Sequence, residues 1–100
     1  MSIEMRGFIV HIDSENEWIE VSLDDLADVG ISPSDLSEKT VRENAMDQVR
    51  IFLSEEEDAD LFLEKYDKKY GEKVPMMYTT MNYEGRCFIR NLRSIRKADA

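Results

Sequence analysis

The sequence has little of the residues that most often carry chemistry: in 100 residues there is one cysteine, Cys87, and one histidine, His11. A single cysteine forms no intramolecular disulfide, so the chain gains nothing from an oxidising compartment and a cytoplasmic location is expected. Neither residue belongs to a CxxC, HExxH or GxSxG motif. A small buried thiol and a packed or surface histidine are the ordinary interpretations, so we predict no enzyme activity.

Glycine, proline and long apolar runs are also scarce, with four glycines and two prolines in the chain. The glycines are scattered and form neither a GxGxxG motif nor a phosphate-binding loop, so no cofactor is expected. No segment approaches the roughly 18 apolar residues that a membrane-spanning helix needs. The N-terminus also lacks the apolar run and cleavage site of a secretion signal.

Positive charge is missing from a long stretch of the chain. No lysine or arginine lies between Arg6 and Lys39. The acids of that stretch are Asp13, Glu15, Glu17, Glu20, Asp24, Asp25, Asp28, Asp35 and Glu38. The whole chain has 22 acids and 13 bases, which gives a formal net charge of -9. Such a charge repels nucleic-acid phosphates and anionic membranes and favours a basic protein partner.

The C-terminal end has the opposite charge. Its basic residues are Arg86, Arg90, Arg93, Arg96 and Lys97. The molecule is therefore expected to be polarised, unless this end folds onto acids of the same domain or both regions are simply solvated.

One hundred residues with 42% hydrophobic content suit one compact core. We predict a single domain over residues 1–100, with frayed ends near residues 1–4 and 97–100.

The clearest local signal is an amphipathic helix from Ser54 to Gly71. Ser54 is expected to be the N-cap, with Glu57 completing a capping box, and Gly71 is expected to end the helix. The predicted buried face has helical spacing and comprises Ala59, Phe62, Leu63, Tyr66 and Tyr70.

Alternating apolar residues predict strands at 6–13 and 18–23, joined as a hairpin. Ser22 is expected to cap a short helix that Gly30 ends, with Asp25 at the capping-box position. Ser32 and Asp35 favour one further helical turn. A strand is favoured at 48–53, whereas residues 38–47 are left open between helix and loop.

After Gly71, two β-rich runs around Glu84 and Gly85 predict a second hairpin. Pro75 indicates that the first run begins at a sheet edge or irregularly. Residues 88–96 are interpreted as a strand, with a helix as the alternative. The predicted fold class is α+β, with an antiparallel or mixed sheet of about five strands and one long helix and one or two short helices on one face.

Two acidic segments have features of a metal site. Asp13, Glu15, Glu17 and Asp24 match calcium-loop positions, but Trp18 replaces the glycine that the loop requires, so that site is rejected. A loose divalent site within 55–60 is left open against the simpler interpretation that acids at a helix start favour its dipole.

The leading functional prediction is a non-catalytic interaction or accessory domain whose acidic face meets a basic protein. That face is predicted to comprise Asp24, Asp25, Asp28, Glu55, Glu56, Glu57, Asp58 and Asp60. Its sharpest form is an inhibitor that mimics DNA and occupies the groove of a nucleic-acid-binding protein. Association of this kind weakens as salt rises.

The alternative is a small homodimer that binds a ligand. An apolar interface or pocket is predicted from Trp18, Met76, Met77, Tyr78, Met81 and Tyr83. The residues of 76–83 alternate between two faces of one strand, and Met and Tyr are common at interfaces. The pocket itself is expected to be lined by Trp18, Tyr78 and Tyr83. An enzyme that uses two convergent carboxylates is the third reading.

Overall fold

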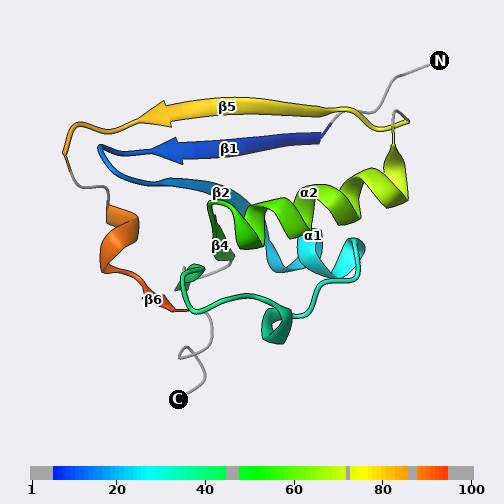
Figure 1. The fold of residues 1–100 in the computed structure, drawn as a ribbon, viewed down its shortest axis with the longest axis horizontal. Coiled ribbons are helices and arrows are strands. Elements are labelled where there is room, and N and C mark those ends of the chain that lie inside the picture. The colour runs from blue at the N-terminus through cyan, green and yellow to red at the C-terminus, as the bar shows by residue number, and fades with distance from the viewer. Residues whose placement is uncertain (1–5, 45–47, 72, 86–87, 95–100) are drawn as a thin grey trace.

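The computed structural model describes residues 6–44, 48–71, 73–85 and 88–94. One sheet organises them, with strand order β5-β1-β2-β4-β3-β6 (Figure 1). The strands are β1 (Arg6–Ile12), β2 (Glu17–Ser22), β3 (Val41–Asn44), β4 (Val49–Ser54), β5 (Met76–Asn82) and the short β6 (Arg93–Ser94). The helices are α1 (Leu23–Asp28) and α2 (Glu57–Tyr70), with 3₁₀ turns η1 (Pro33–Asp35) and η2 (Phe88–Asn91). The α+β prediction is confirmed.

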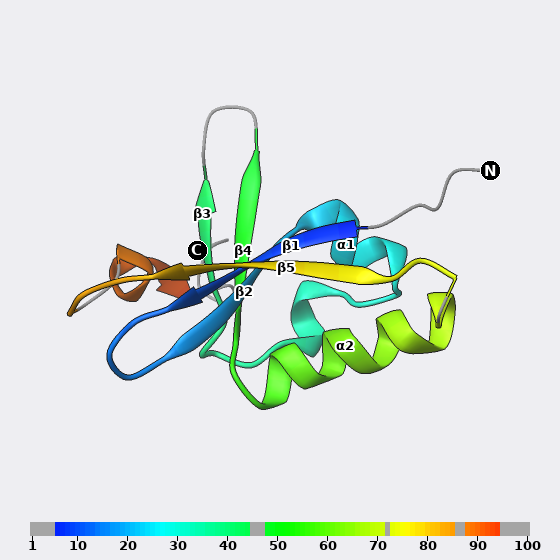
Figure 2. The same ribbon diagram turned by 90° about the horizontal axis from the view of Figure 1, so that it is seen from above.

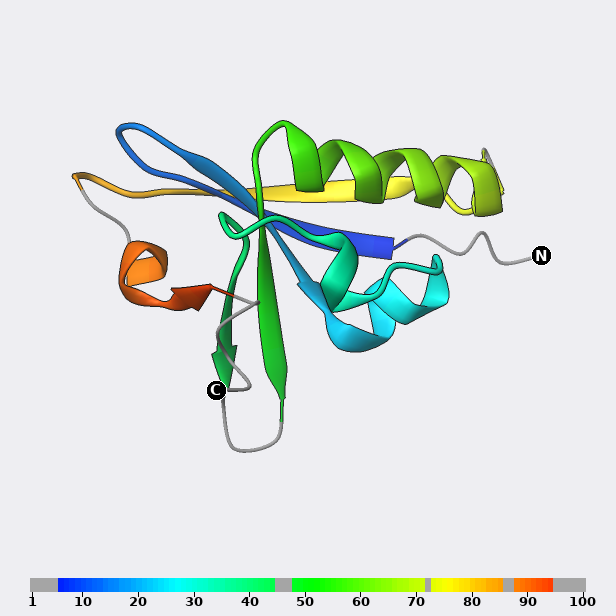
Figure 3. The same cartoon turned by 60° about the horizontal axis from the view of Figure 1, so that its bottom comes forward.

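The sheet is mixed because α2 returns the chain across it. β2 is antiparallel to both β1 and β4, so β4 runs parallel to β1, and β5 also runs parallel to β1. A parallel return needs a crossover connection, which α2 supplies between β4 and β5. The β3–β4 hairpin crosses β1 and β5 at a steep angle, as the views in Figures 2 and 3 show.

The larger core lies between the sheet and the two helices, which sit beneath β1 and β5 in Figure 1. Alternate strand residues face it because side chains alternate across a strand. Phe8 of β1 packs edge-to-face on Phe62 of α2, with ring centroids 5.4 Å apart. The core also contains Ile19, Val21, Leu26, Val29, Ile31, Leu36, Ile51, Leu53, Ala59 and Tyr66. The predicted buried face of α2 is confirmed at Ala59, Phe62 and Tyr66, while Leu63 and Tyr70 are half-buried.

The opposite face of the sheet has a smaller core. Trp18, Phe52 and Ile89 are buried there, with Val41, Tyr83 and Leu92 packed against them. Ile89 belongs to η2, which folds across this face. Both faces are therefore covered in part, although the long helix and α1 lie on only one of them.

The start of α1 forms as predicted. The Ser22 hydroxyl accepts a hydrogen bond from Asp25 N at 3.0 Å, and Asp25 Oδ2 accepts one from Ser22 N at 2.8 Å. Gly30 follows the helix with φ +80°. Ser32 and Asp35 make the same reciprocal arrangement at η1, so this predicted turn is also confirmed.

The predicted start of α2 is wrong. Ser54 is the last residue of β4, where it pairs with Trp18, and the helix begins at Glu57. Its N-cap is Glu56, which has φ 74° and makes no side-chain capping bond. The Ser54 hydroxyl instead donates to the buried carboxylate of Asp58 at 3.3 Å. Gly71 ends the helix as predicted, with φ +53°.

Two further segments differ from expectation. Within 38–47, which was left open between helix and loop, residues 41–44 form β3 and pair with β4. Residues 45–47 lie outside the described part.

The prediction of a second hairpin around Glu84 and Gly85 is also wrong. β5 pairs with β1, whereas residues 88–91 form a 3₁₀ turn and 93–94 pair with β3. The physical reason is that Ile89 gains burial on the smaller core, which a strand beside β5 would forfeit. Cys87, residues 95–96 and the predicted frayed ends at 1–4 and 97–100 lie outside the described residues.

Candidate functional site

The two predicted acidic clusters lie at opposite ends of α2. Lys69, near the C-terminal end of α2, donates to Asp28 Oδ1 at 2.8 Å, so α1 packs beside that end. The acids of 55–60 surround the other end. A helix of 14 residues is about 21 Å long. The eight predicted acids therefore do not form one continuous face.

The cluster on α1 is largely paired within the fold. Arg6 Nη1 donates to Asp28 Oδ2 at 2.8 Å, and Arg6 also pairs with Asp25. The Tyr70 hydroxyl also donates a hydrogen bond to Asp28 Oδ2. The hydrogen bond from Lys69, followed by that from Tyr70, lowers the pKa of Asp28 to about 2. Asp24 is the member of this cluster that stays exposed.

In the other cluster, Asp58 lies inside the molecule and is 3% exposed. Its carboxylate accepts hydrogen bonds from Ser37 N at 3.0 Å and from Ser37 Oγ at 2.8 Å, and another from Thr40. Asp58 thus ties the loop before β3 to the start of α2, and it presents no charge to a partner. The prediction that it belongs to an exposed face is wrong.

Glu55, Glu56, Glu57 and Asp60 are exposed around the start of α2. Glu17 joins them from β2, because the pairing of Trp18 with Ser54 places the start of β2 at the end of β4, and Glu17 lines the same hollow as Glu55. The sequence prediction missed Glu17. Only the knowledge that β2 pairs with β4 could have placed it there, and that pairing joins segments far apart in the chain.

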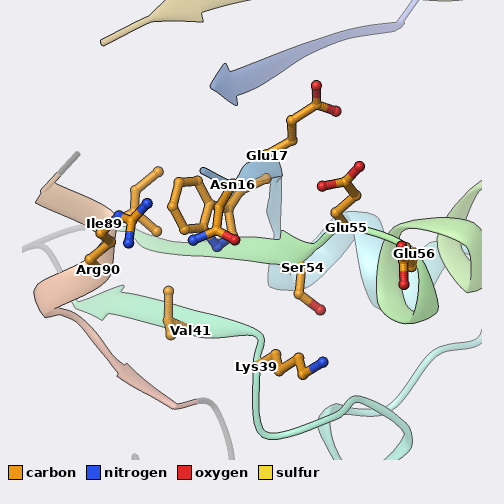
Figure 4. A pocket seen from close by; sticks show the side chains of 10 residues that line it. Asn16, Glu17, Lys39, Val41, Ser54, Glu55, Glu56, Ile89 and Arg90 are labelled. Atoms are coloured by element: carbon orange, nitrogen blue, oxygen red, sulfur yellow. The ribbon is translucent and has the colours of Figure 1, made fainter. Parts of the chain in front are cut away.

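A hollow of about 590 Å³ opens beside this cluster (Figure 4). Glu17, Glu55 and Glu56 line one side of it, and Trp18, Val41 and Ile89 contribute apolar surface. A second hollow of about 340 Å³ shares Glu17, Trp18, Glu55 and Glu56 and extends toward Leu63 and Tyr78. We call Glu17, Glu55 and Glu56 the acidic rim.

None of the cations in the described part of the chain forms an ion pair with the acidic rim. Lys39 lines the larger hollow on another side in Figure 4. Arg90 also lines it, but its guanidinium is held by Asp13, with Nη2 to Oδ1 at 2.8 Å, and by Glu15. These carboxylates raise the pKa of Arg90, chiefly because Asp13 accepts hydrogen bonds from its guanidinium. At Arg90, the alternative to a polarised molecule is observed, since this part of the basic end folds onto acids of the same domain.

The predicted apolar residues separate into different places. Trp18 is buried, and Met76 packs half-buried against the larger core. Met77, Tyr78 and Met81 are exposed large side chains of β5. Trp18 and Tyr78 line the same smaller hollow, whereas Tyr83 stacks on His11.

Of the two ordinary interpretations of His11, a packed or a surface histidine, the structure shows the packed one. Its Nδ1 lies 2.7 Å from the Tyr83 hydroxyl and its Nε2 lies 2.9 Å from Glu20 Oε1. Its ring meets Phe52 edge-to-face. Both ring nitrogens are thus engaged within the fold.

Among the described residues, no three acidic, histidine or cysteine side chains converge as a metal site requires. Over the same residues, none of the helices has the length and apolar character needed to span a bilayer.

Comparison with protein-family models, with curated proteins and with solved structures gave no match to this chain.

Proposed function

We propose that this chain is a non-catalytic interaction domain that binds a basic segment of a protein partner at the acidic rim, in the cytoplasm. The observation that carries the proposal is a set of exposed carboxylates that form no ion pair with a described cation, placed on the edge of a hollow with apolar lining. Like charges held together repel one another, and a cationic side chain entering the hollow removes that repulsion.

The apolar lining adds a second element of recognition. Val41, which is half-buried, and the small exposed part of Trp18 offer a surface for an aliphatic or aromatic side chain beside the charges. Interfaces gain most of their affinity from buried anchors of this kind, while rim charges set the rate and specificity of association. The preferred partner segment therefore carries Lys or Arg next to an apolar residue.

The location favours a short basic segment over an extended nucleic-acid-binding groove. The cluster on α1 is neutralised by Arg6 and Lys69, so carboxylates that are free to meet a partner concentrate near the start of α2. The DNA-mimic form of the proposal stays a prediction. Competition by duplex DNA for a captured nucleic-acid-binding partner tests it directly.

The test is a titration with a synthetic peptide that alternates arginine and leucine. Binding is monitored through the fluorescence of Trp18, the only tryptophan in the chain. Changing Glu17, Glu55 and Glu56 together to Gln is expected to weaken binding about tenfold, because each exposed ion pair contributes about 0.2 to 1 kcal/mol. Binding is also expected to weaken as salt rises.

The matched control removes the same number of charges elsewhere. Asp24→Asn, Asp67→Asn and Glu84→Gln alter exposed acids away from the hollow, and affinity is expected to change less than twofold. If both triple variants weaken binding equally, attraction is diffuse and the acidic rim is not the site.

A second candidate is the ligand-binding homodimer. It is favoured by the smaller hollow, where Trp18 and Tyr78 lie together with Leu63. An uncharged apolar probe that changes Trp18 fluorescence equally in the wild type and in the rim variant would support this candidate over the first.

A further inference from the structure

Strand β5 ends the sheet on one side, and none of the described elements lies beyond it (Figure 1). It pairs with β1 continuously from Arg6↔Met76 to Ile12↔Asn82, without a bulge. Its sequence, MMYTTMN, contains no charge and no proline, although 35% of the chain is charged. Edge strands are normally protected from pairing with other chains by charges, prolines or bulges. The outer edge of β5 has none of these protections.

Hydrogen bonds at the ends of β5 identify which backbone groups face outward. Arg6 N donates to Pro75 O at 3.1 Å, and Tyr83 N donates to Ile12 O at 2.8 Å. In a parallel pair, alternate residues turn both backbone groups toward the neighbouring strand. Odd-numbered residues from 75 to 83 therefore bond to β1. The outward-facing groups are those of Met76, Tyr78, Thr80 and Asn82.

We propose that β5 pairs with β5 of a second copy of this chain, antiparallel and about a two-fold axis at Thr79. This register sets Tyr78 opposite Thr80 and Met76 opposite Asn82 of the other copy. Both are pairs of outward-facing residues, so each pair exchanges two hydrogen bonds. All the outward backbone groups of β5 are then used, and the contact closes with two copies.

The side chains are also compatible in this register. Met77 and Met81, which are 53% and 45% exposed, lie on one face and meet across the contact. Pairs without hydrogen bonds bring side chains closest, with Cα atoms about 4.5 Å apart. Association therefore covers two exposed methionines from each copy, and Tyr78 lies beside Thr80 on the other face.

The sequence of β5 favours a second copy over a foreign strand. Self-pairing brings no like charges together at the contact, even though each copy has a formal net charge of -9. That net charge repels the copies at longer range, and salt screens the repulsion. Self-association is thus expected to strengthen as salt rises, which is opposite to binding of a basic segment at the acidic rim.

The experiment places charges on the two-fold axis and measures association by analytical ultracentrifugation over a range of concentrations. Thr79 is exposed, and its counterpart in the second copy lies directly opposite. Thr79→Lys and Thr79→Glu, each alone, are expected to weaken self-association at least about fivefold, since like charges facing each other across strands are unfavourable. An equimolar mixture of the two variants is expected to restore it.

Gln48→Lys is the matched control, because Gln48 is exposed just before β4 and the change in net charge is that of Thr79→Lys. It is expected to leave self-association unchanged. Amide exchange adds a direct readout: the outward amides of Tyr78 and Thr80 are expected to become protected as concentration rises.

If the wild-type chain stays monomeric at about 1 mM, the proposal is overturned. A strand of another protein is then the remaining candidate for pairing with the outer edge of β5. A dimer that neither Thr79 variant weakens, or that the mixture does not restore, also overturns it. The rim variants are expected to dimerise normally, so loss of the proposed function and loss of dimerisation are separate results.

Discussion

At the scale of single residues, Asp28 links folding to pH. Lys69, Tyr70 and Arg6 all hydrogen-bond its carboxylate, and its pKa falls to about 2 from an ordinary value of 3.8. The unfolded chain therefore takes up this proton first as the pH falls. The stabilisation from Asp28 is complete above about pH 5 and is lost as the pH falls through about 4 to 2. We expect Asp28→Asn to flatten the decline in unfolding free energy over that window, as measured by urea denaturation.

Asp24→Asn is the control for this prediction, since Asp24 is an exposed neighbour on the same helix. Asp24→Asn is expected to leave the decline in unfolding free energy at low pH as it is in the wild type. If the unfolding free energy of Asp28→Asn falls as steeply at low pH as that of the wild type, the hydrogen bonds of Asp28 with Lys69 and Tyr70 do not have the assigned role.

At the scale of elements, Asp58 joins the start of α2 to the loop before β3. Its buried carboxylate accepts hydrogen bonds from Ser37, Thr40 and Ser54. Hydrogen bonds to a charged group contribute about 1.5 to 3 kcal/mol each, with losses that are not additive. We expect Asp58→Ala to lower the unfolding free energy by about 2 to 4 kcal/mol in chemical denaturation.

Glu57→Ala tests the same turn of helix at an exposed position, and a change within about 0.5 kcal/mol is expected. If the two variants are equally stable, the carboxylate of Asp58 does not anchor α2.

At the scale of the whole molecule, the sheet is held by a core on each face. Ile89 of η2 is fully buried beside Trp18 and Phe52, so η2 acts as the cover of the smaller core. We expect Ile89→Ala to destabilise the protein by about 2 to 5 kcal/mol. The loss of cover is expected to move Trp18 emission to longer wavelength while the chain remains folded.

Leu23→Ala, an exposed change on α1, is expected to leave the emission of Trp18 unchanged. An unshifted emission in Ile89→Ala would show that η2 does not shield Trp18.

The candidate site was predictable only in part. The sequence placed exposed acids at the start of α2, because Glu55, Glu56 and Glu57 precede or begin a well-marked helix. It could not show that Asp58 among them is buried, since that depends on Ser37 and Thr40 reaching it from another segment. Nor could it place Glu17 beside Glu55.

What the sequence determined by itself is the local structure. The spacing of Ala59, Phe62 and Tyr66 specified the buried face of α2, and Ser22 with Asp25 specified the start of α1, because these interactions join residues only a few positions apart. Tertiary structure decided how the segments meet. The pairing of Phe8 with Tyr78, which makes β5 an open edge, depends on burial and hydrogen bonding between distant segments. Alternating apolar residues identify a strand, but they carry no information about which neighbour it joins.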